Sequence, residues 1–492
     1  MISMKQTIYI LSLLLLGLTS CSKNIRVAGS LHIGAKIFPD YKSVVLPVNI
    51  APLDFSVLNA GNFPTCLLIE GGGEIIEVKG EQGNFEIPTG KWKDLLERQK
   101  GHKIKFIIVK QMNHKWYSYT PFTMMVAPDS IDRYVAYRLI PPGYELWRKM
   151  GIYQRCLENY NQSPIYENRF SNNNCVNCHS FPMQNPNKMV FHMRSFSSGT
   201  VLLDNGKIEK LNTKTPQTIS AFVYPSWHPS GRYIAFSTNT TRQMFFMNQR
   251  NRIEVYDSAS DIVVYDIKTH VVLGTPLLMS SNAFETFPTF SPDGKTLYFC
   301  RAKAISPMPD RYKDVHYNLC SISFDPVKRQ FGKNIRVLYN AEKYSKSVSF
   351  PRVSPDGKYL VFTRQKFGNF SIWHKDADLF MLTLRTGKVV PMTIVNSKDV
   401  ESYHSWSHDS RWLIFSSRRL DGLYTRLFIT YIDKNGKTYK PFLLPQKDPY
   451  QYYHNLMYSY NIPEFLVGKV KLDQEKVARI MRNSPGINVS FR

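Results

Sequence analysis

The stretch Phe290-Ser291-Pro292-Asp293-Gly294-Lys295-Thr296-Leu297-Tyr298-Phe299-Cys300 decides the fold of this chain. Its centre predicts a tight turn, because proline presets φ, the aspartate side chain caps the turn backbone and glycine accepts a positive φ. The apolar residues on either side predict two strands that are buried against neighbouring sheets. The stretch therefore predicts a pair of short strands joined by a turn.

The same pattern recurs in three further copies, which begin at Trp227, Val353 and Trp406. In chain order the four copies start 63, 63 and 53 residues apart. Each copy continues into an outer pair of predicted strands, such as Asp378–Leu384 and Val389–Thr393. A period of this length, built on a turn between two strands, is typical of a propeller blade with four strands.

These repeats resemble the TolB-like, WD-related propeller repeats of bacterial envelope proteins over roughly residues 190–445. The resemblance implies a ring of six blades. The four copies and a hairpin just after residue 188 account for five. The sixth blade must therefore come from residues 131–174 or from the C-terminal tail.

The chain as a whole is predicted to be all-β. Residues 41–126 alternate short β-rich runs with turn residues, which predicts a small β-sandwich-like domain before the six-bladed TolB-like propeller. The other expected segments are a signal peptide over 1–20, a tether over 21–40, a connecting segment over 127–188, the propeller over 189–446, and an aromatic, then helical tail over 447–492 that packs on or closes the propeller.

The motif with the clearest chemistry is Cys175-Val176-Asn177-Cys178-His179. Two thiols at this spacing can add to the vinyl groups of a porphyrin, and the following histidine can bind the iron. The motif predicts one covalently attached haem c, used for electron transfer or haem-based sensing. His192 is the first candidate for the sixth ligand and Met193 the second, because neighbours in a strand face opposite ways and only one of them can face the iron.

The alternative interpretation is that Cys175 and Cys178 form a disulfide in a non-enzymatic, protein- or glycan-binding propeller. A redox dithiol would need a βαβ context, and zinc would need two further ligands at suitable spacing. The sequence contains no phosphate-binding loop, zinc-protease signature or nucleophile elbow, so it leaves open whether the protein is an enzyme. Cys300 and Cys320 are expected to be either cross-strand partners in a disulfide or two buried free thiols.

The N-terminus predicts export. Lys5 precedes an apolar run over 8–18 that is too short to span a bilayer. The ending Leu18-Thr19-Ser20-Cys21 resembles a bacterial lipobox, which implies cleavage before Cys21 and anchoring through lipid on that residue. The combination of this ending with the β-rich region, the CxxCH motif and the repeats resembles a group of Bacteroidetes-type lipoproteins. That resemblance implies location and architecture but no activity.

The formal net charge of +25 is distributed without any long run of lysines and arginines. On an exported, lipid-anchored protein, this favours an anionic membrane surface or an acidic partner over nucleic acid. We therefore expect a lipid-anchored protein of the cell envelope, at the periplasmic or outer face of the outer membrane, with a protein partner there.

Overall fold

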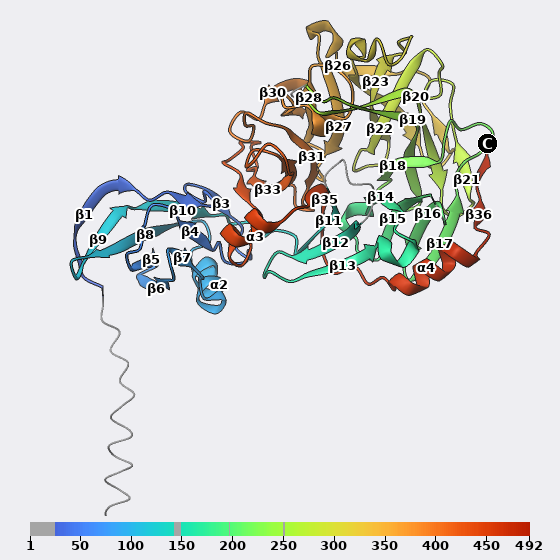
Figure 1. Ribbon diagram of the computed structural model, residues 1–492. Helices are drawn as coiled ribbons and strands as arrows, with labels where there is room; N and C mark the ends of the chain where they lie inside the picture. Colours follow the sequence, from blue (N-terminus) through green and yellow to red (C-terminus); the bar gives the residue numbers. More distant parts are fainter. Residues whose placement is uncertain (1–24, 142–148, 196, 249–250) are drawn as a thin grey trace, which may run out of the picture.

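The computed structural model describes residues 25–141, 149–195, 197–248 and 251–492. Six sheets follow one another around a common axis and form a six-bladed β-propeller (Figure 1). The innermost strands of successive blades contact each other around the whole ring. The all-β propeller expected from the repeats is therefore confirmed.

Five blades are built from consecutive segments of the chain, each from its innermost to its outermost strand. Their strands are β14 (Cys175–Ser180), β15 (Lys188–Arg194), β16 (Gly199–Asp204) and β17 (Lys207–Asn212) in blade one; β18 (Phe222–Trp227), β19 (Tyr233–Phe245), β20 (Ile253–Asp266) and β21 (Val271–Leu273) in blade two; β22 (Ala283–Phe290), β23 (Thr296–Lys303), β24 (Asn318–Asp325), β25 (Gln330–Phe331) and β26 (Arg336–Tyr339) in blade three; β27 (Ser347–Val353), β28 (Tyr359–Gln365), β29 (Asp378–Thr383) and β30 (Lys388–Pro391) in blade four; and β31 (Glu401–Trp406), β32 (Trp412–Ser417), β33 (Arg426–Tyr431) and β34 (Phe442–Leu443) in blade five.

Blade six joins two segments that are far apart in the chain. Its innermost strand is β35 (Ser459–Leu466), which pairs with β11 (Tyr134–Ile140), followed outward by β12 (Gly151–Cys156) and β13 (Gln162–Glu167). Figure 1 shows the red β35 beside the blue-green β11. Both segments that the sequence offered as sources of a sixth blade thus contribute to it, and their pairing closes the ring.

The end of the chain strengthens this closure. Two short strands, β36 (Ile487–Asn488) and β37 (Ser490–Phe491), pair in parallel with the outer edges of blades one and two. Helix α4 (Gln474–Asn483) buries Val477 and Met481 in the core shared by blades one and six. Paired edges of this kind leave fewer backbone groups unsatisfied.

The predicted turn chemistry is present in blade three. The carboxylate of Asp293 accepts the backbone N–H of Lys295 at 3.0 Å, and Gly294 has a φ of 72°. The ring of His228, in the equivalent turn of blade two, has its Nε2 atom 3.1 Å from the Gly294 carbonyl oxygen. The turns therefore also connect neighbouring blades.

The N-terminal part folds into two sheets around a shared core, with one helix, α2 (Thr89–Arg98). The larger sheet contains β1 (Val27–Gly34), β3 (Val45–Leu46), β5 (Thr65–Gly71), β6 (Glu74–Gly80), β8 (Lys103–Met112), β9 (Lys115–Thr120) and β10 (Phe122–Val126), and the smaller contains β2 (Ile37–Phe38), β4 (Phe55–Val57) and β7 (Asn84–Phe85).

The expected tether is partly ordered in the structure. Strand β1 is largely exposed and forms the edge of the larger sheet, parallel to β9, so backbone pairing rather than burial holds it. The N-terminal part then packs on blade five. Tyr41 donates to the Leu443 carbonyl at 3.2 Å, and the indole N–H of Trp412 donates to the Ser130 carbonyl at 2.9 Å.

The remaining helical elements are short. They are α3 (Pro449–Asn455) and 3-10 turns at Asn168–Ser171, Pro182–Gln184, Tyr312–Asp314, Glu342–Tyr344 and Ser371–Trp373. Within the described residues, no helix is long and apolar enough to cross a membrane.

Cys300 and Cys320 are buried free thiols and not disulfide partners. They lie on adjacent strands, but Cys300 is opposite Leu319 while Cys320 is opposite Phe299. This offset of one residue sends their side chains to opposite faces of the sheet, because side chains alternate along a strand. Each thiol consequently belongs to a different hydrophobic cluster.

Candidate axial binding site

A bulge at the same place in every innermost strand shapes the centre of the propeller. In each blade the pairing with the second strand shifts register there. One residue at each bulge has a φ of about 50°, an uncommon value for residues other than glycine. These six residues are Cys178, Tyr224, Phe287, Phe350, Tyr403 and Ile462.

The bulge residues form a ring around the axis. Four of them are aromatic and contact each other in blade order. The ring centroids are 4.8 Å apart from Tyr224 to Phe287, 4.0 Å apart from Phe287 to Phe350 and 4.8 Å apart from Phe350 to Tyr403. Cys178 and Ile462 complete this aromatic ring in blades one and six.

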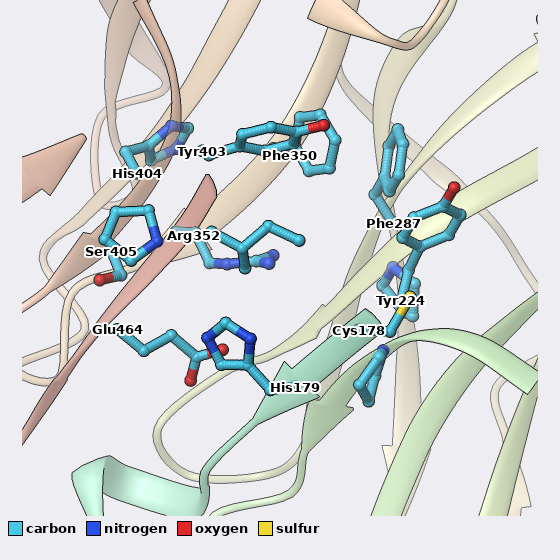
Figure 2. A pocket seen from close by; sticks show the side chains of 14 residues that line it. Cys178, His179, Tyr224, Phe287, Phe350, Arg352, Tyr403, His404, Ser405 and Glu464 are labelled. Carbon is cyan, nitrogen blue, oxygen red and sulfur yellow. The ribbon is translucent and has the colours of Figure 1, made fainter. Parts of the chain in front are cut away.

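A pocket lies against the aromatic ring on the axis, and all six innermost strands line it (Figure 2). Its volume is about 510 Å³ including the part open to solvent, but the free space between the side chains holds only about one or two water molecules. The residue that follows each bulge is a proline or a histidine, and the next residue is serine or threonine in four of the blades. Blades four and six instead place Arg352 and Glu464 there.

Arg352 and Glu464 are the two charged side chains of this axial pocket. They line the same space, as Figure 2 shows, but form no ion pair with each other within the described structure. Arg352 donates one hydrogen bond to the Pro351 carbonyl at 3.0 Å, and the Glu464 carboxylate accepts the Phe181 backbone N–H at 3.2 Å. Burial raises the pKa of Glu464 to about 7, although Arg352 opposes that shift.

The second half of the CxxCH motif belongs to this pocket. Cys178 is the bulge residue of β14, and His179 occupies the position that His404 holds in blade five. Burial, with the nearby cationic Arg138, lowers the pKa of His179 to about 3, so its imidazole is neutral at pH 7. Among the described residues, neither ring nitrogen of His179 makes a hydrogen bond of good geometry, although the Ile462 backbone acts on the ring weakly, whereas Nε2 of His404 lies 2.9 Å from the Val361 carbonyl oxygen.

The other predicted haem residues lie outside the pocket lining. Cys175 is the first residue of β14 and is buried opposite Arg194. His192 lies on β15, where its Nδ1 atom is 3.1 Å from the hydroxyl oxygen of Thr200. Met193 is fully buried in the core between blades one and six. His192 and Met193 thus point to opposite faces of β15.

The residues around the motif do not fit a haem in this conformation. The space next to His179 admits about one or two water molecules, whereas a porphyrin is a broad, flat macrocycle. A haem would require β14 to move away from its neighbours in the ring. The two unpartnered nitrogens of His179 and the free thiols of Cys175 and Cys178 are nevertheless the groups that haem attachment needs.

Two further chemical possibilities can be compared with the described residues. Within them, no group of three or more histidine, cysteine, aspartate or glutamate side chains is arranged to hold a metal ion. All six described cysteines, including Cys175 and Cys178, are free thiols. The structure thus contains no Cys175–Cys178 disulfide. Cys21 lies outside the described residues.

Sequence analysis missed Arg352, Glu464 and the aromatic ring, although a signal for them was present. Near its end, each inner strand carries a proline or histidine directly after the bulge residue, and in four of the six strands the next residue is serine or threonine. Tyr224-Pro225-Ser226 and Tyr403-His404-Ser405 are two examples. Aligning this pattern would have placed Cys178-His179-Ser180 in the same register and shown Arg352 and Glu464 as the exceptions.

Comparisons with known proteins give similarity at the level of fold. No family model and no curated protein matches the sequence. Similar solved structures include a prolyl endopeptidase at 12% identity and TM-score 0.32, a putative 6-phosphogluconolactonase from Bacteroides fragilis at 12% and 0.30, and a periplasmic gluconolactonase from Pseudomonas aeruginosa at 12% and 0.34.

These matches cover 70%, 63% and 68% of this chain, and 49%, 94% and 99% of the other chains, respectively. The chain therefore spans about half the length of the prolyl endopeptidase. Its own sheet topology, with six blades closed by β35 and β11, is what establishes the propeller here.

Proposed function

We propose that this protein is a lipid-anchored binding protein of the cell envelope, and that its propeller holds the polar end of a ligand on the axis. The supporting observation is that Arg352 and Glu464 line one pocket with opposite charges and do not pair with each other. A guanidinium donates several hydrogen bonds and a carboxylate accepts them. The free space is small, so the pocket suits only the terminal polar group of a ligand that carries both acceptors and donors, such as the end of a peptide or of a sugar whose remainder lies outside the pocket.

The anchor in this proposal is the lipid expected on Cys21. The lipobox-like ending Leu18-Thr19-Ser20-Cys21 supports it, and the net charge of +25 favours attraction to an anionic membrane surface or an acidic partner. Globomycin treatment of cells that express the full chain tests the anchor, because it blocks processing of lipoprotein precursors. Accumulation of the precursor is expected, and unchanged processing would contradict it.

A ligand screen tests the binding role. The purified protein is heated with a panel of amino acids, dipeptides and neutral and acidic monosaccharides. The same panel is run on Arg352→Gln and Glu464→Gln, with Arg385→Gln as a control that removes an exposed charge. We expect at least one compound to raise the melting temperature of the wild type and the control but not of either pocket variant. A panel in which no compound distinguishes these proteins would overturn the proposal.

A second candidate function is electron transfer or haem-based sensing through one haem c on Cys175, Cys178 and His179. The observation that favours it is the pair of unpartnered ring nitrogens on His179 beside two free thiols. In that case, the haem would supply one-electron redox chemistry. His179 would be the residue that binds the iron, and His192 or Met193 would be the candidates for its other side.

Covalent haem is tested by expressing the chain with and without the cytochrome c maturation machinery. The binding-protein proposal expects no Soret band after acid-acetone extraction and an intact mass equal to that of the polypeptide with its lipid. A band that survives extraction and disappears in Cys175→Ser/Cys178→Ser would instead establish the haem. His192→Ala would then show, through a changed reduced spectrum, whether His192 is a ligand.

A further inference from the structure

Three arginines lie on the side of the aromatic ring where the innermost strands begin. Arg194 is opposite Cys175, the first residue of β14. Arg418 directly follows β32, whose last residue Ser417 is opposite the first residue of β31. Arg138 is opposite Asn461 in the first half of β35. The arginines thus come from blades one, five and six, which are neighbours in the ring.

The strand register places the three arginines at the same end of the ring, and their electrostatic influence on two residues of the aromatic ring agrees with this placement. Arg194 and Arg138 both lower the pKa of the Cys178 thiol, against the larger opposing effect of burial. Arg138 and Arg418 both lower the pKa of the Tyr403 hydroxyl, again against the larger opposing effect of burial. Cys178 and Tyr403 belong to the aromatic ring, so the three arginines lie near this ring at the end where the innermost strands begin, and we call this group of three residues the arginine mouth.

None of the three arginines is neutralised within the described structure. They form no ion pair and no side-chain hydrogen bond, and the Nε atoms of Arg138 and Arg418 are buried without a partner. Arg418 does lie over the ring of Trp373, 4.4 Å from its centroid. A buried guanidinium nitrogen without a partner is unfavourable, so a group that is missing from the protein itself would stabilise Arg138 and Arg418.

The acidic residues nearby are already committed elsewhere. Asp257 faces Arg194, but its carboxylate accepts hydrogen bonds from Asn239 at 2.7 Å, Thr241 at 2.6 Å and Asn369 at 2.6 Å. Asp399, which influences Arg418, lies 3.8 Å from the ammonium group of Lys375. Asp421, which also influences Arg418, lies 4.0 Å from a guanidinium nitrogen of Arg426.

The other blades contribute uncharged side chains at the same level. In blades two, three and four, the position equivalent to Arg194 and Arg418, counted from the bulge of the inner strand, carries Asn239, Ala302 and Gln365, respectively. The positive charge is therefore concentrated on one half of the mouth. The amides of Asn239 and Gln365 in the other half already form hydrogen bonds within the protein.

We propose that the arginine mouth, formed by Arg138, Arg194 and Arg418, binds an oxyanion of the ligand: a carboxylate, sulfate or phosphate group. Guanidinium groups match these anions in shape and can donate two parallel hydrogen bonds to each. This inference deepens the proposed function by naming the ligand chemistry, and it rests on the propeller acting as a binding scaffold.

Calorimetric titrations with inorganic phosphate, sulfate, citrate and an oligogalacturonate test it, at fixed ionic strength near 150 mM. The proteins are the wild type, Arg138→Gln, Arg194→Gln, Arg418→Gln and Arg352→Gln, with Arg385→Gln as the charge-matched control. We expect at least one probe to bind, and its affinity to fall about tenfold or more in each arginine-mouth variant but not in the control. Binding of the oligogalacturonate alone would indicate an acidic glycan, and binding of the small ions would indicate a free anion.

Three results would overturn the inference. The first is that no probe binds. The second is that Arg385→Gln weakens binding as much as the mouth variants, which would show that binding depends on the overall net charge and not on these three arginines. The third is that only Arg352→Gln loses binding, which would put the anion in the axial pocket and leave the proposed function intact.

Stability without ligand gives an independent readout. Replacing a cation whose Nε atom is buried without a partner should leave the melting temperature of Arg138→Gln unchanged or higher in a buffer free of these anions. A lower melting temperature for this variant would assign Arg138 a structural role and contradict the inference.

Discussion

The indole N–H of Trp406 donates a hydrogen bond at 3.1 Å to the backbone carbonyl of Arg352, whose side chain lines the axial pocket. Trp227 makes the equivalent bond to Ser180, also at 3.1 Å. Each tryptophan lies three residues after the bulge of its own inner strand, and each acceptor lies two residues after the bulge of the preceding blade. Contact between blades and the shape of the axis therefore depend on the same bulges.

Trp406→Phe and Trp227→Phe should each lower the free energy of unfolding by about 1–3 kcal/mol, because each leaves a carbonyl oxygen between two blades without its partner. Urea unfolding followed by circular dichroism measures the effect. Trp116→Phe is the control, since the indole of Trp116 makes no hydrogen bond within the described structure and is only half-buried. Equal losses in all three variants would show that the interblade bond adds nothing.

Gly294→Ala should destabilise the propeller more than Gly206→Ala. Both glycines have a positive φ, 72° and 88°, so both substitutions incur about 1 kcal/mol of backbone strain. A Cβ on residue 294 would also lie 2.0 Å from Nε2 of His228, whereas a Cβ on residue 206 meets nothing within 4 Å. The additional loss, roughly 1–3 kcal/mol from displacing a hydrogen-bonded ring, is measured by thermal unfolding. Equal destabilisation of the two variants would contradict the packing between the turns of blades two and three.

Glu464 should make the stability of the protein depend on pH. Its pKa is about 7 in the folded protein, against an ordinary value of 4.5, because burial disfavours the carboxylate. The folded state therefore holds the proton more tightly, and the stabilising contribution is complete below pH 4.5 and disappears as the pH rises through 7. Relative to the wild type, Glu464→Gln should become more stable between about pH 5 and pH 8.

The measurement for this prediction is the difference in unfolding free energy between the wild type and Glu464→Gln at several pH values. Other buried carboxyls, such as Glu285, titrate in both proteins and cancel in the difference. A difference that stays constant across this pH range would show that the carboxylate is well solvated in the pocket.

The thiols of Cys175 and Cys178 should react with iodoacetamide only after the protein is unfolded. Both are buried and free, and burial raises the pKa of Cys178, which lowers the fraction of reactive thiolate. Cys300 and Cys320 should behave in the same way and serve as internal references. Peptide mass spectrometry after labelling with and without urea measures this. A linked Cys175–Cys178 peptide, or a haem-modified one, would contradict the free-thiol state.

The propeller was predictable from the sequence because the residues that specify each turn and strand lie next to one another in the chain. Ser291 to Lys295 specify a turn by the conformational preferences of each residue, and the alternation that follows specifies a strand buried on one face. Repetition of this unit at a nearly constant interval then indicates a ring of blades. The same local chemistry is present in the structure, where Asp293 caps the turn and Gly294 takes the positive φ.

The axial site was not predictable in this way. The pattern of the inner strands can align Arg352 with Glu464, but only closure of the ring brings the two side chains into one pocket. Arg352 lies in blade four and Glu464 in a strand that pairs with Tyr134–Ile140, more than 300 residues earlier in the chain. The CxxCH motif is the opposite case, because its local signal is clear but its place in the fold is not contained in that signal. Its spacing predicts haem attachment, whereas the fold puts Cys178 and His179 in a bulge that recurs in all six blades. Sequence by itself therefore determined the turn-and-strand unit and its repetition, and only tertiary structure decided which side chains share the axis, since strand register and ring closure are properties of the whole chain.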